Sequence, residues 1–413
     1  MEEAEQRDID AARQELEDMA WPEPETVTKG VTSLNDAETH EERFNRLSAV
    51  SDAEYPSSPL DVGVTALTYA EKGGWTYARS IQQAMTDIAT RHGEDCMFIG
   101  EDMEVAGAFG MNMALKNAGH TDKLIDMPLC EAAIVHTGVG AALSGMRPMV
   151  EIQFGGFAAL GFNALLNNAA MLRWRWGAEC PMTIRIPLGA RTRSGPFHAN
   201  MIESWFANDP GLVVVAAGTP QDAYDLLMES AELNDPVLFL EHIGLYGLRG
   251  GLTGWGQNIN QIVDTETVQQ AIANGERYKL GKAAVVRGGR DVTLVTWGSM
   301  LHVAQQAAEE LAREDIEVEI VDLRTLLPFD AQTCIESVSR TGRLVVLQEG
   351  QWCGGLGHSI QSRILETCFY TLESAPLVIG ALDTPVPFSP PLENFTIPSL
   401  EHVVKVLRLT TQS

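Results

Sequence analysis

The alternation of short apolar runs with helix-like segments is the feature that most restricts the fold of this chain. From Trp75 onward, strand-like runs such as CMFIG, MTIRIP and PVLFLE alternate with amphipathic stretches. In YARSIQQAMTDIA, Ile81, Met85 and Ile88 fall on one helical face. The segment TPQDAYDLLMESA begins with a capping Thr followed by Pro, as helices often do. This order predicts an α/β fold with a mostly parallel sheet.

The same pattern divides the chain into four segments. Its 413 residues are too many for one ordinary core, so two domains are expected. We predict an acidic, largely extended N-terminal arm over residues 1–73 and a first α/β domain over residues 74–243. A Gly- and Asn-rich linker over 244–279 and a second α/β domain over 280–413 follow.

The N-terminal arm differs from the rest of the chain in composition. Its first 60 residues carry 16 Asp and Glu against 5 Lys and Arg, a net charge of −11. One short helix is predicted around residues 8–19, ended by the prolines of WPEPE at 21–25. A disordered tail and an arm that wraps a partner subunit are the two interpretations of this segment.

Charge and hydropathy exclude several classes of function. The net charge of −27 disfavours nucleic acid and anionic membrane surfaces, because both attract Lys and Arg. No apolar run approaches the roughly 20 residues of a membrane span, and the acidic N-terminus does not resemble a signal peptide. The six cysteines are scattered without a CxxC motif, so we expect a cytoplasmic protein without nucleic-acid or membrane partners.

Motifs of several enzyme classes are absent from the sequence. There is no GxSxG, no HExxH and no Walker A motif. The segment GQWCGGLGHSI (350–360) follows a predicted strand and opens a helix, as phosphate-binding turns do, but its spacing is not GxGxxG. A tight turn that permits close backbone packing is the favoured interpretation.

A single acid in an apolar stretch is the sharpest candidate for chemistry. Glu131 lies in LIDMPLCEAAI, just before the Gly- and Ala-rich GVGAALSG. A buried carboxylate is costly unless it has a partner. It is either a helix-start acid favoured by the helix dipole, or an acid of raised pKa that shares a proton with a heteroaromatic nitrogen. Nearby, Phe154 and Phe157 offer faces against which a ring could stack.

His198 is the second candidate. It lies in RSGPFHANMIESWF, a Gly- and Pro-containing loop between a predicted strand and a short helix. Loops of this kind carry catalytic groups more often than cores do, and histidine suits proton transfer near neutral pH. From the residues alone, a structural histidine stays the alternative.

Together these segments resemble a known family, the β subunit of the thiamine-diphosphate-dependent E1 component of 2-oxo acid dehydrogenases, of the pyruvate, branched-chain or acetoin type. The resemblance runs from about Trp75 to the C-terminus in ordered blocks. They include IGED (99–102), DMPLCEAAI (126–134), HANMIESWFANDPGLVVV (198–215), GGLGHSI (354–360) and LDTPVPFSPPLE (382–393). The family fold is a pyrimidine-binding α/β domain followed by a transketolase C-terminal domain.

The resemblance implies roles for the candidate residues. Glu131 matches the glutamate that hydrogen-bonds N1′ of the aminopyrimidine and helps to generate the reactive C2 ylide. Phe157, together with Phe154, is implied to contact the pyrimidine ring. His198 matches the active-site histidine that faces the substrate. The implied reaction decarboxylates a 2-oxo acid and passes the acyl group to a lipoyl group, with the cofactor as electron sink.

An absent motif implies a partner. Enzymes of this kind hold the diphosphate through Mg²⁺ bound by a GDG motif, and no GDG occurs in this chain. The chain is therefore expected to carry half of a site and to need an α-type subunit, in an α₂β₂ heterotetramer that also serves a lipoyl-bearing E2. No side chain is assigned to a metal. The family's β subunits also hold K⁺ through backbone carbonyl groups, which leave no signature in a sequence.

Four features depart from the family pattern. HANM (198–201) stands where the family often reads His-Ser-Gln-Ser, and His136 replaces a small residue. Gly155 and Gly156 stand where one acid is common, and the arm is long and acidic. Two alternatives therefore stay open. One is an acyloin-forming carboligase subunit of a specialised biosynthetic pathway, and the other is a non-enzymatic assembly subunit.

Overall fold

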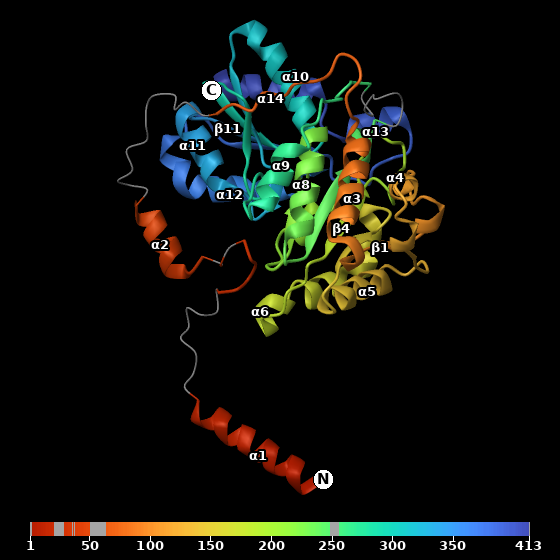
Figure 1. Cartoon of the computed structure of the whole chain (residues 1–413). Coiled ribbons are helices and arrows are strands. Elements are labelled where there is room, and N and C mark those ends of the chain that lie inside the picture. The colour runs from red at the N-terminus through yellow and green to blue at the C-terminus, as the bar shows by residue number, and fades with distance from the viewer. Residues whose placement is uncertain are drawn as a thin grey trace.

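Two parallel-dominated sheets organise the molecule, which confirms the predicted α/β fold (Figure 1). The computed structural model describes residues 2–19, 29–34, 36, 38–49, 63–247 and 256–412. Within these residues the first sheet contains, in spatial order, β10 (Thr325–Leu327), β5 (Val213–Val215), β6 (Val237–His242), β4 (Thr183–Leu188), β3 (Arg147–Glu151), β1 (Cys96–Gly100) and β2 (Leu124–Asp126). The second contains β12 (Leu377–Ala381), β11 (Leu344–Gln351), β8 (Val292–Thr296), β9 (Val318–Asp322) and β7 (Ala284–Arg287).

Helices separate the strands in both halves of the chain. The first half contains α3 (Tyr77–His92), α4 (Met113–Asn117), α5 (Glu131–Leu143), α6 (Leu172–Trp176), α7 (Glu203–Phe206), α8 (Pro220–Glu232) and α9 (Glu266–Ala273). The second contains α10 (Met300–Leu311), α11 (Ala331–Thr341), α12 (Leu356–Cys368), α13 (Pro390–Thr396) and α14 (Leu400–Gln412). Short helical turns are η3 (Gly93–Asp95), η4 (Met103–Val105), η5 (Thr121–Lys123), η6 (Gly155–Gly161), η7 (Ala164–Ala169), η8 (Ile243–Leu245), η9 (Ala312–Glu314) and η10 (Phe369–Thr371).

Threonine side chains cap the starts of α3 and α8, and the cap of α8 was predicted from the sequence. The Thr76 hydroxyl accepts a hydrogen bond from the Arg79 backbone N–H at 3.1 Å and begins α3. The Thr219 hydroxyl accepts one from the Asp222 N–H at 3.0 Å and begins α8. The apolar face of α3 is fully buried, and α3 packs against α8 over one face of the first sheet.

The strands of the first sheet are covered on both faces. Every residue of β4 and of β6 is buried, as expected of parallel strands that lie between two helical layers. The core on the side of α3 and α8 is separate from the core on the side of α5. The core beside α5 continues into α11 and α12 of the second half, so this core is shared by the two halves.

The two halves are also joined by a strand and by buried charges. β10 lies between β9 and β11 of the second sheet in sequence but pairs antiparallel with β5 of the first sheet. Lys279 bridges Asp222 and Asp225 of α8 at 2.7 and 2.8 Å, and Arg324 lies 3.3 Å from Asp222. The domain bounds expected from the sequence stay a prediction, and residues 248–255 of the expected linker lie outside the described residues.

The N-terminal arm contains more helix than the sequence predicts. α1 (Glu2–Asp18) begins before residue 8 and lies apart from the body in Figure 1, while the prolines of WPEPE fall outside the described residues. A second helix, α2 (His40–Ala49), was not predicted. α2 contacts α12 through ion pairs: Arg46 pairs with Glu366 of α12 at 2.9 Å, and Arg43 pairs with the same carboxylate. No described helix has both the length and the apolar character of a membrane span.

Candidate functional site

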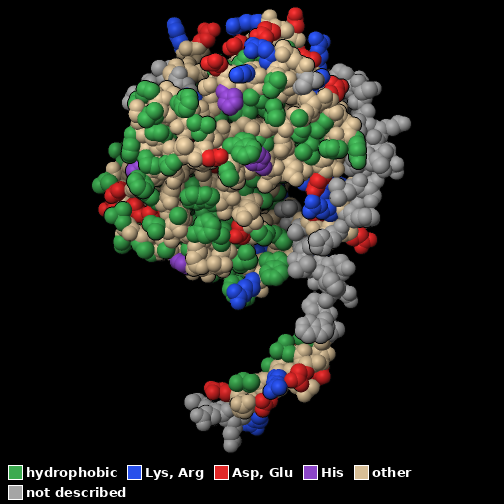
Figure 2. All heavy atoms as spheres, turned by 180° about the vertical axis from the view of Figure 1, so that it is seen from behind, with side chains coloured by type: hydrophobic (Ala, Val, Ile, Leu, Met, Phe, Trp, Pro, Cys, Tyr) green, Lys and Arg blue, Asp and Glu red, His purple; other side chains and the backbone are tan. Residues whose placement is uncertain are grey.

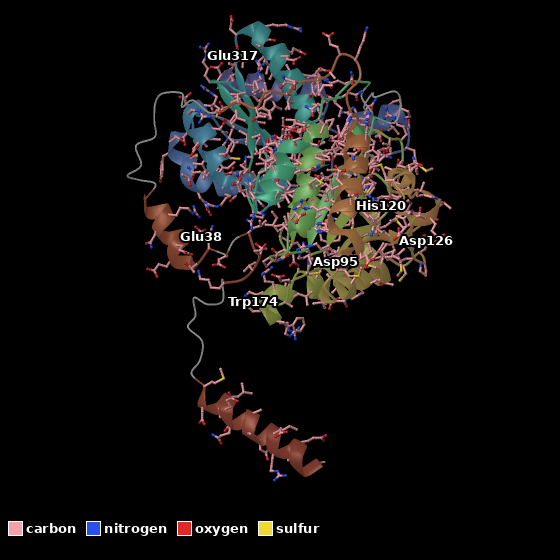
Figure 3. The ribbon with its side chains drawn as sticks, in the orientation of Figure 1. Glu38, Asp95, His120, Asp126, Trp174 and Glu317 are labelled. Carbon is pink, nitrogen blue, oxygen red and sulfur yellow. The ribbon has the colours of Figure 1, made fainter. Side chains whose placement is uncertain are left out.

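The carboxyl ends of β1, β2 and β3 meet at one edge of the first sheet. These strands are adjacent and parallel, with Gly100 opposite Asp126 and Ile99 opposite Val150. Figure 3 labels Asp95, which precedes β1 and marks the amino ends of these strands, and Asp126, which ends β2 and marks their carboxyl ends. Ligands of α/β proteins bind outside the carboxyl ends of the strands. A site is therefore expected at the Asp126 edge.

Glu131 lies at this edge as the first residue of α5. It is 8% exposed and is the acid of the first turn, where the helix dipole favours a negative charge. No described residue donates a hydrogen bond to its carboxylate or forms an ion pair with it. A buried carboxylate with open acceptor positions is suited to bind a donor from outside the chain.

A second buried acid lies beside Glu131 and was missed by the sequence analysis. Glu101 directly follows β1, is 4% exposed, and its Oε1 has no hydrogen-bond partner among the described residues. Burial, and then the negative charge of Glu131, raises the pKa of Glu101 to about 6. The only sequence signal was an acid placed directly after a buried strand in IGED.

The other three predicted site residues form one aromatic cluster. The ring centre of His198 lies 4.4 Å from that of Phe154 and 5.5 Å from that of Phe157. Phe154 and Phe157 are 5.6 Å apart, and the planes of all three pairs are nearly perpendicular. Edge-to-face contacts of this kind are favourable. The structure thus brings together side chains that lie more than 40 residues apart in the sequence.

The helical turn η6 connects this cluster to Glu131. Phe157 lies in η6, which packs against α5. A Cβ placed on Gly161 would lie 3.2 Å from Cγ2 of Val135 and 3.7 Å from the carbonyl oxygen of Glu131. The end of η6 therefore approaches the first turns of α5 closely, and Glu131 and Phe157 stand on adjoining elements.

Gly155 and Gly156 let η6 approach the loop that carries His198. A Cβ on Gly155 would lie 2.9 Å from the carbonyl oxygen of Asn200, and one on Gly156 would lie 2.8 Å from that of Phe197. Both distances are too short for a side chain, so these positions require glycine. The departure from the family pattern at 155–156 is therefore explained by close backbone contact.

A local hydrogen bond orients the imidazole of His198. Its Nδ1 lies 3.2 Å from the carbonyl oxygen of Ser194, which can only accept a hydrogen bond. Nδ1–H is therefore the donor, and in the neutral ring Nε2 keeps its lone pair. An imidazole held in this way can take up or release a proton at Nε2.

The remaining sequence departures make contacts within the chain. Ala199 is buried in a small apolar cluster with Ala190 and with Ala381 of the second half. On α5, Nδ1–H of His136 donates to the carbonyl oxygen of Ala132 at 2.7 Å, and the side-chain amide of Asn168 lies 3.2 Å from Nε2.

A buried ion network supports the sheet beneath the site. Arg185 of β4 donates to Glu151 of β3 at 2.8 Å and to Glu241 of β6 at 2.6 and 2.9 Å. The Tyr246 hydroxyl donates to Glu241 at 2.6 Å. Burial alone lowers the pKa of Arg185, but Glu241 and Glu151 raise it above its ordinary value. Removal of one partner from such a network leaves a buried charge, which costs about 3–5 kcal/mol.

The site offers a proton partner and aromatic faces, but its described side chains do not form a metal-ligand set. In residues 2–19, 29–34, 36, 38–49, 63–247 and 256–412, no group of three or more His, Cys, Asp or Glu is placed to hold a metal ion. The carboxylate and the phenyl rings fit a heteroaromatic ring with a protonatable nitrogen.

Two domain families match most of the chain. The transketolase pyrimidine binding domain matches residues 74–248, and the transketolase C-terminal domain matches residues 281–403. A solved structure described as "Split gene transketolase, inactive beta4 tetramer" shares the fold, with a TM-score of 0.58 and 19% sequence identity. The match covers 82% of this chain and 99% of that chain.

Relatives with higher identity match a similar share of the chain. The β subunit of acetoin:2,6-dichlorophenolindophenol oxidoreductase from Cupriavidus necator is 40% identical over 313 residues, which are 75% of this chain and 87% of that protein. The β subunit of the pyruvate dehydrogenase E1 component is 35% identical over 332 residues in Bacillus subtilis, covering 79% and 96%. Its Staphylococcus epidermidis counterpart is 34% identical over 340 residues, covering 82% and 98%. The chain therefore belongs to the family of E1 β subunits of pyruvate and acetoin dehydrogenases, within the transketolase superfamily.

Proposed function

We propose that this chain is the β subunit of a heteromeric E1 component that uses thiamine diphosphate to decarboxylate a 2-oxo acid and to transfer the acyl group to a lipoyl group. The observation that carries this proposal is the buried Glu131 carboxylate, which has open acceptor positions and stands beside the element that bears Phe157. A ring with a protonatable nitrogen satisfies the carboxylate and contacts the phenyl face at once.

Each site residue has a role in this function. Glu131 holds the proton at N1′ of the aminopyrimidine, which makes burial of its carboxylate tolerable. Phe157, with Phe154, contacts the ring and fixes its position. His198 faces the substrate and moves a proton at Nε2. The bound cofactor supplies a nucleophilic carbon and an electron sink, so the chain itself positions groups and controls protonation.

An α-type partner with a GDG motif completes the site by holding Mg²⁺ and the diphosphate. Exposed apolar side chains next to each site residue support this half-site arrangement. Leu129 is 84% exposed, Leu160 66% and Phe197 69%, and they lie two, three and one residues from Glu131, Phe157 and His198. Figure 2 shows hydrophobic side chains spread over a wide area of one face. Apolar surface of this extent marks a face that binds another protein.

The helix α6 also carries exposed aromatic side chains. Trp174 and Trp176 are 49% and 58% exposed. Figure 3 shows Trp174 at the outer edge of the molecule. We assign the assembly as an α₂β₂ heterotetramer that delivers acyl groups to a lipoyl-bearing E2, with any K⁺ held by backbone carbonyl groups. The cytoplasm suits this enzyme because all six cysteines are free, and Cys130 and Cys353 are exposed.

The substrate has two candidates. Pyruvate follows from the relatives at 34% and 35% identity, and acetoin from the relative at 40% identity. Acetoin is a 2-hydroxy ketone, so its use would break the bond between the carbonyl carbon and the hydroxylated carbon and release acetaldehyde in place of carbon dioxide. The relatives are named as dehydrogenases or an oxidoreductase, which favours this chemistry over the carboligase alternative.

Reconstitution with the α-type partner tests the proposal. Each chain alone should be inactive. The mixture should consume pyruvate or acetoin with an artificial electron acceptor only when thiamine diphosphate and Mg²⁺ are present. Calorimetry should show weak cofactor binding by this chain alone. Tight, Mg²⁺-dependent binding by the isolated chain, or a mixture inactive on both substrates, would contradict the proposal. Activity on acetoin but not on pyruvate would replace decarboxylation of a 2-oxo acid by cleavage of a 2-hydroxy ketone.

A further inference from the structure

The loop that leads into His198 has an unusual backbone. Arg191 and Arg193 have φ angles of 69° and 64°, in the left-handed region that side-chain-bearing residues seldom adopt. Gly189 and Gly195 stand on either side with φ angles of 95° and 76°. Glycine adopts this conformation freely, but arginine does not. Contacts from outside the loop must therefore hold the two arginines in place.

Glu393 of α13 provides these contacts from the second half of the chain. It is fully buried. Its Oε1 accepts hydrogen bonds from the backbone N–H groups of Arg191 at 2.9 Å and of Arg193 at 3.3 Å. Its Oε2 forms an ion pair with the guanidinium of Arg193. One carboxylate therefore binds the backbone of both strained residues.

Other groups of the second half close over the same loop. The Ala190 N–H donates to Glu349 of β11 at 2.8 Å. A Cβ on Gly195 would lie 2.2 Å from the ring of Phe388, so this ring packs directly on the backbone. The Arg191 guanidinium donates to the carbonyl oxygen of Pro398 at 3.3 Å. The loop is thus enclosed by a separate part of the chain rather than by its own domain.

The loop conformation reaches His198 through two local hydrogen bonds. Nδ1–H of His198 donates to the carbonyl oxygen of Ser194 at 3.2 Å. The backbone N–H of His198 donates to the carbonyl oxygen of Gly195 at 3.3 Å. Both acceptors directly follow the residues that Glu393 holds. A change in the backbone at 191–193 therefore shifts the acceptors that orient the imidazole against Phe154 and Phe157.

We propose that Glu393 is a positioning residue for the reaction. It holds residues 189–195 so that His198 stays against the two phenylalanines, and it makes the C-terminal transketolase domain responsible for the geometry of the acid–base group. The effect on turnover rests on the proposed function of His198. The anchoring of the loop does not depend on that function.

Proteolysis of the full chain tests the anchoring without cofactor or partner. Trypsin cuts after Arg191 and Arg193 only when the loop opens, so the cleavage rate reports the open population. Glu393→Gln keeps the size of the side chain but turns an amide NH₂ group toward the loop or the guanidinium. We expect cleavage at these arginines to be about tenfold faster. Cleavage after the exposed Arg13 of α1 is the internal reference and should not change.

Kinetics of the reconstituted enzyme test the positioning role. For Glu393→Gln we expect kcat per cofactor-titrated site to fall about tenfold, with unchanged KM for the substrate and unchanged cofactor affinity. A purely structural role would lower the amount of folded enzyme but leave kcat per site unchanged. Glu401→Gln is the matched control, since Glu401 is an exposed acid of α14 in the same domain.

The outcomes separate the two proposals. Faster loop cleavage with wild-type kcat would overturn the positioning role, and wild-type cleavage with wild-type kcat would overturn the anchoring as well. If the wild-type complex is inactive but Glu393→Gln accelerates cleavage, the proposed function fails and the anchoring stands. Glu393→Ala should show the larger acceleration, and if it does not fold, the result for Glu393→Gln decides.

Discussion

The pKa of a buried acid in this chain depends strongly on its surroundings, as Glu203 shows. It follows the His198 loop as the first residue of α7, is 3% exposed, and its Oε2 has no hydrogen-bond partner among the described residues. Burial, and then the neighbouring charge of Glu349, raises the pKa of Glu203 to about 7. Glu349 differs because His242 lies 2.9 Å away and lowers the pKa of its carboxyl group to about 2 despite burial.

The raised pKa predicts a pH-dependent gain of stability for Glu203→Gln. An unfolded carboxyl group of this type titrates near 4.5, so between pH 4.5 and about 7 the folded chain keeps a proton that the unfolded chain releases. The stability of the wild type therefore falls as the pH rises through this window. Relative to the wild type, Glu203→Gln should gain about 3 kcal/mol between pH 5 and pH 8.

Urea denaturation at the two pH values measures this gain. Glu401→Gln, which changes an exposed acid, serves as the control and should follow the wild type. Parallel pH dependence of the wild type and Glu203→Gln would show that the buried carboxyl group is not protonated in the folded chain.

At the scale of the element, α5 depends on one glycine for its contact with the sheet. A Cβ on Gly138 would lie 2.6 Å from Sδ of Met182 and 2.6 Å from Cγ2 of Val150, which belongs to β3. Gly140 lies on the same helix but faces open space. The helix that begins with Glu131 therefore sits on the sheet at a distance that only glycine permits at position 138.

Two alanine substitutions in α5 should have opposite effects. Gly138→Ala should destabilise the isolated chain by about 1–3 kcal/mol, because the added methyl group overlaps the core. Gly140→Ala should stabilise it by up to about 1 kcal/mol, because alanine favours the helix. Urea denaturation of both variants gives the comparison. Equal effects of the same sign would mean that α5 does not pack as closely as described.

A comparison of individual helices and strands shows which parts of the fold the sequence could predict. Elements with strong local signals, such as α3, α8 and the buried strand β1, lie where their caps and apolar periods indicate. The three-residue strand β10 was missed, because it forms only by pairing Thr325 with Val215, more than 100 residues away. The helix α2 was missed because HEERFNRLSA is mostly polar and its ion pairs with Glu366 are long-range.

The sequence likewise predicted only part of the candidate site. Glu131 and His198 stood out because a lone acid in an apolar run and a histidine in a glycine loop are unusual. The contact between His198 and Phe154 at 4.4 Å exists only in the fold. Glu101 and Glu393 were missed because their sequence surroundings did not single them out as buried, and the contact of Glu393 with Arg191 spans about 200 residues.

At the scale of the whole molecule, the proposed site has exposed apolar side chains beside it. Leu129, Leu160 and Phe197 are each at least 66% exposed beside the site, whereas the acids behind them are buried. The second half of the chain encloses the His198 loop from one direction and leaves this apolar surface uncovered. These features support the proposal that this chain carries the proton partner of a cofactor and depends on another subunit for the rest of the site.

The activity of the reconstituted complex that carries Glu131→Gln tests this account most directly. Glutamine keeps the size of the side chain but cannot hold the proton, so kcat should fall at least about 100-fold while assembly with the α-type partner is unchanged. Glu94→Gln is the matched control, because Glu94 is an exposed acid before β1 at the opposite edge of the sheet, and it should retain wild-type activity. Wild-type kcat in the Glu131→Gln complex would contradict the assignment of Glu131 as the proton partner of the cofactor.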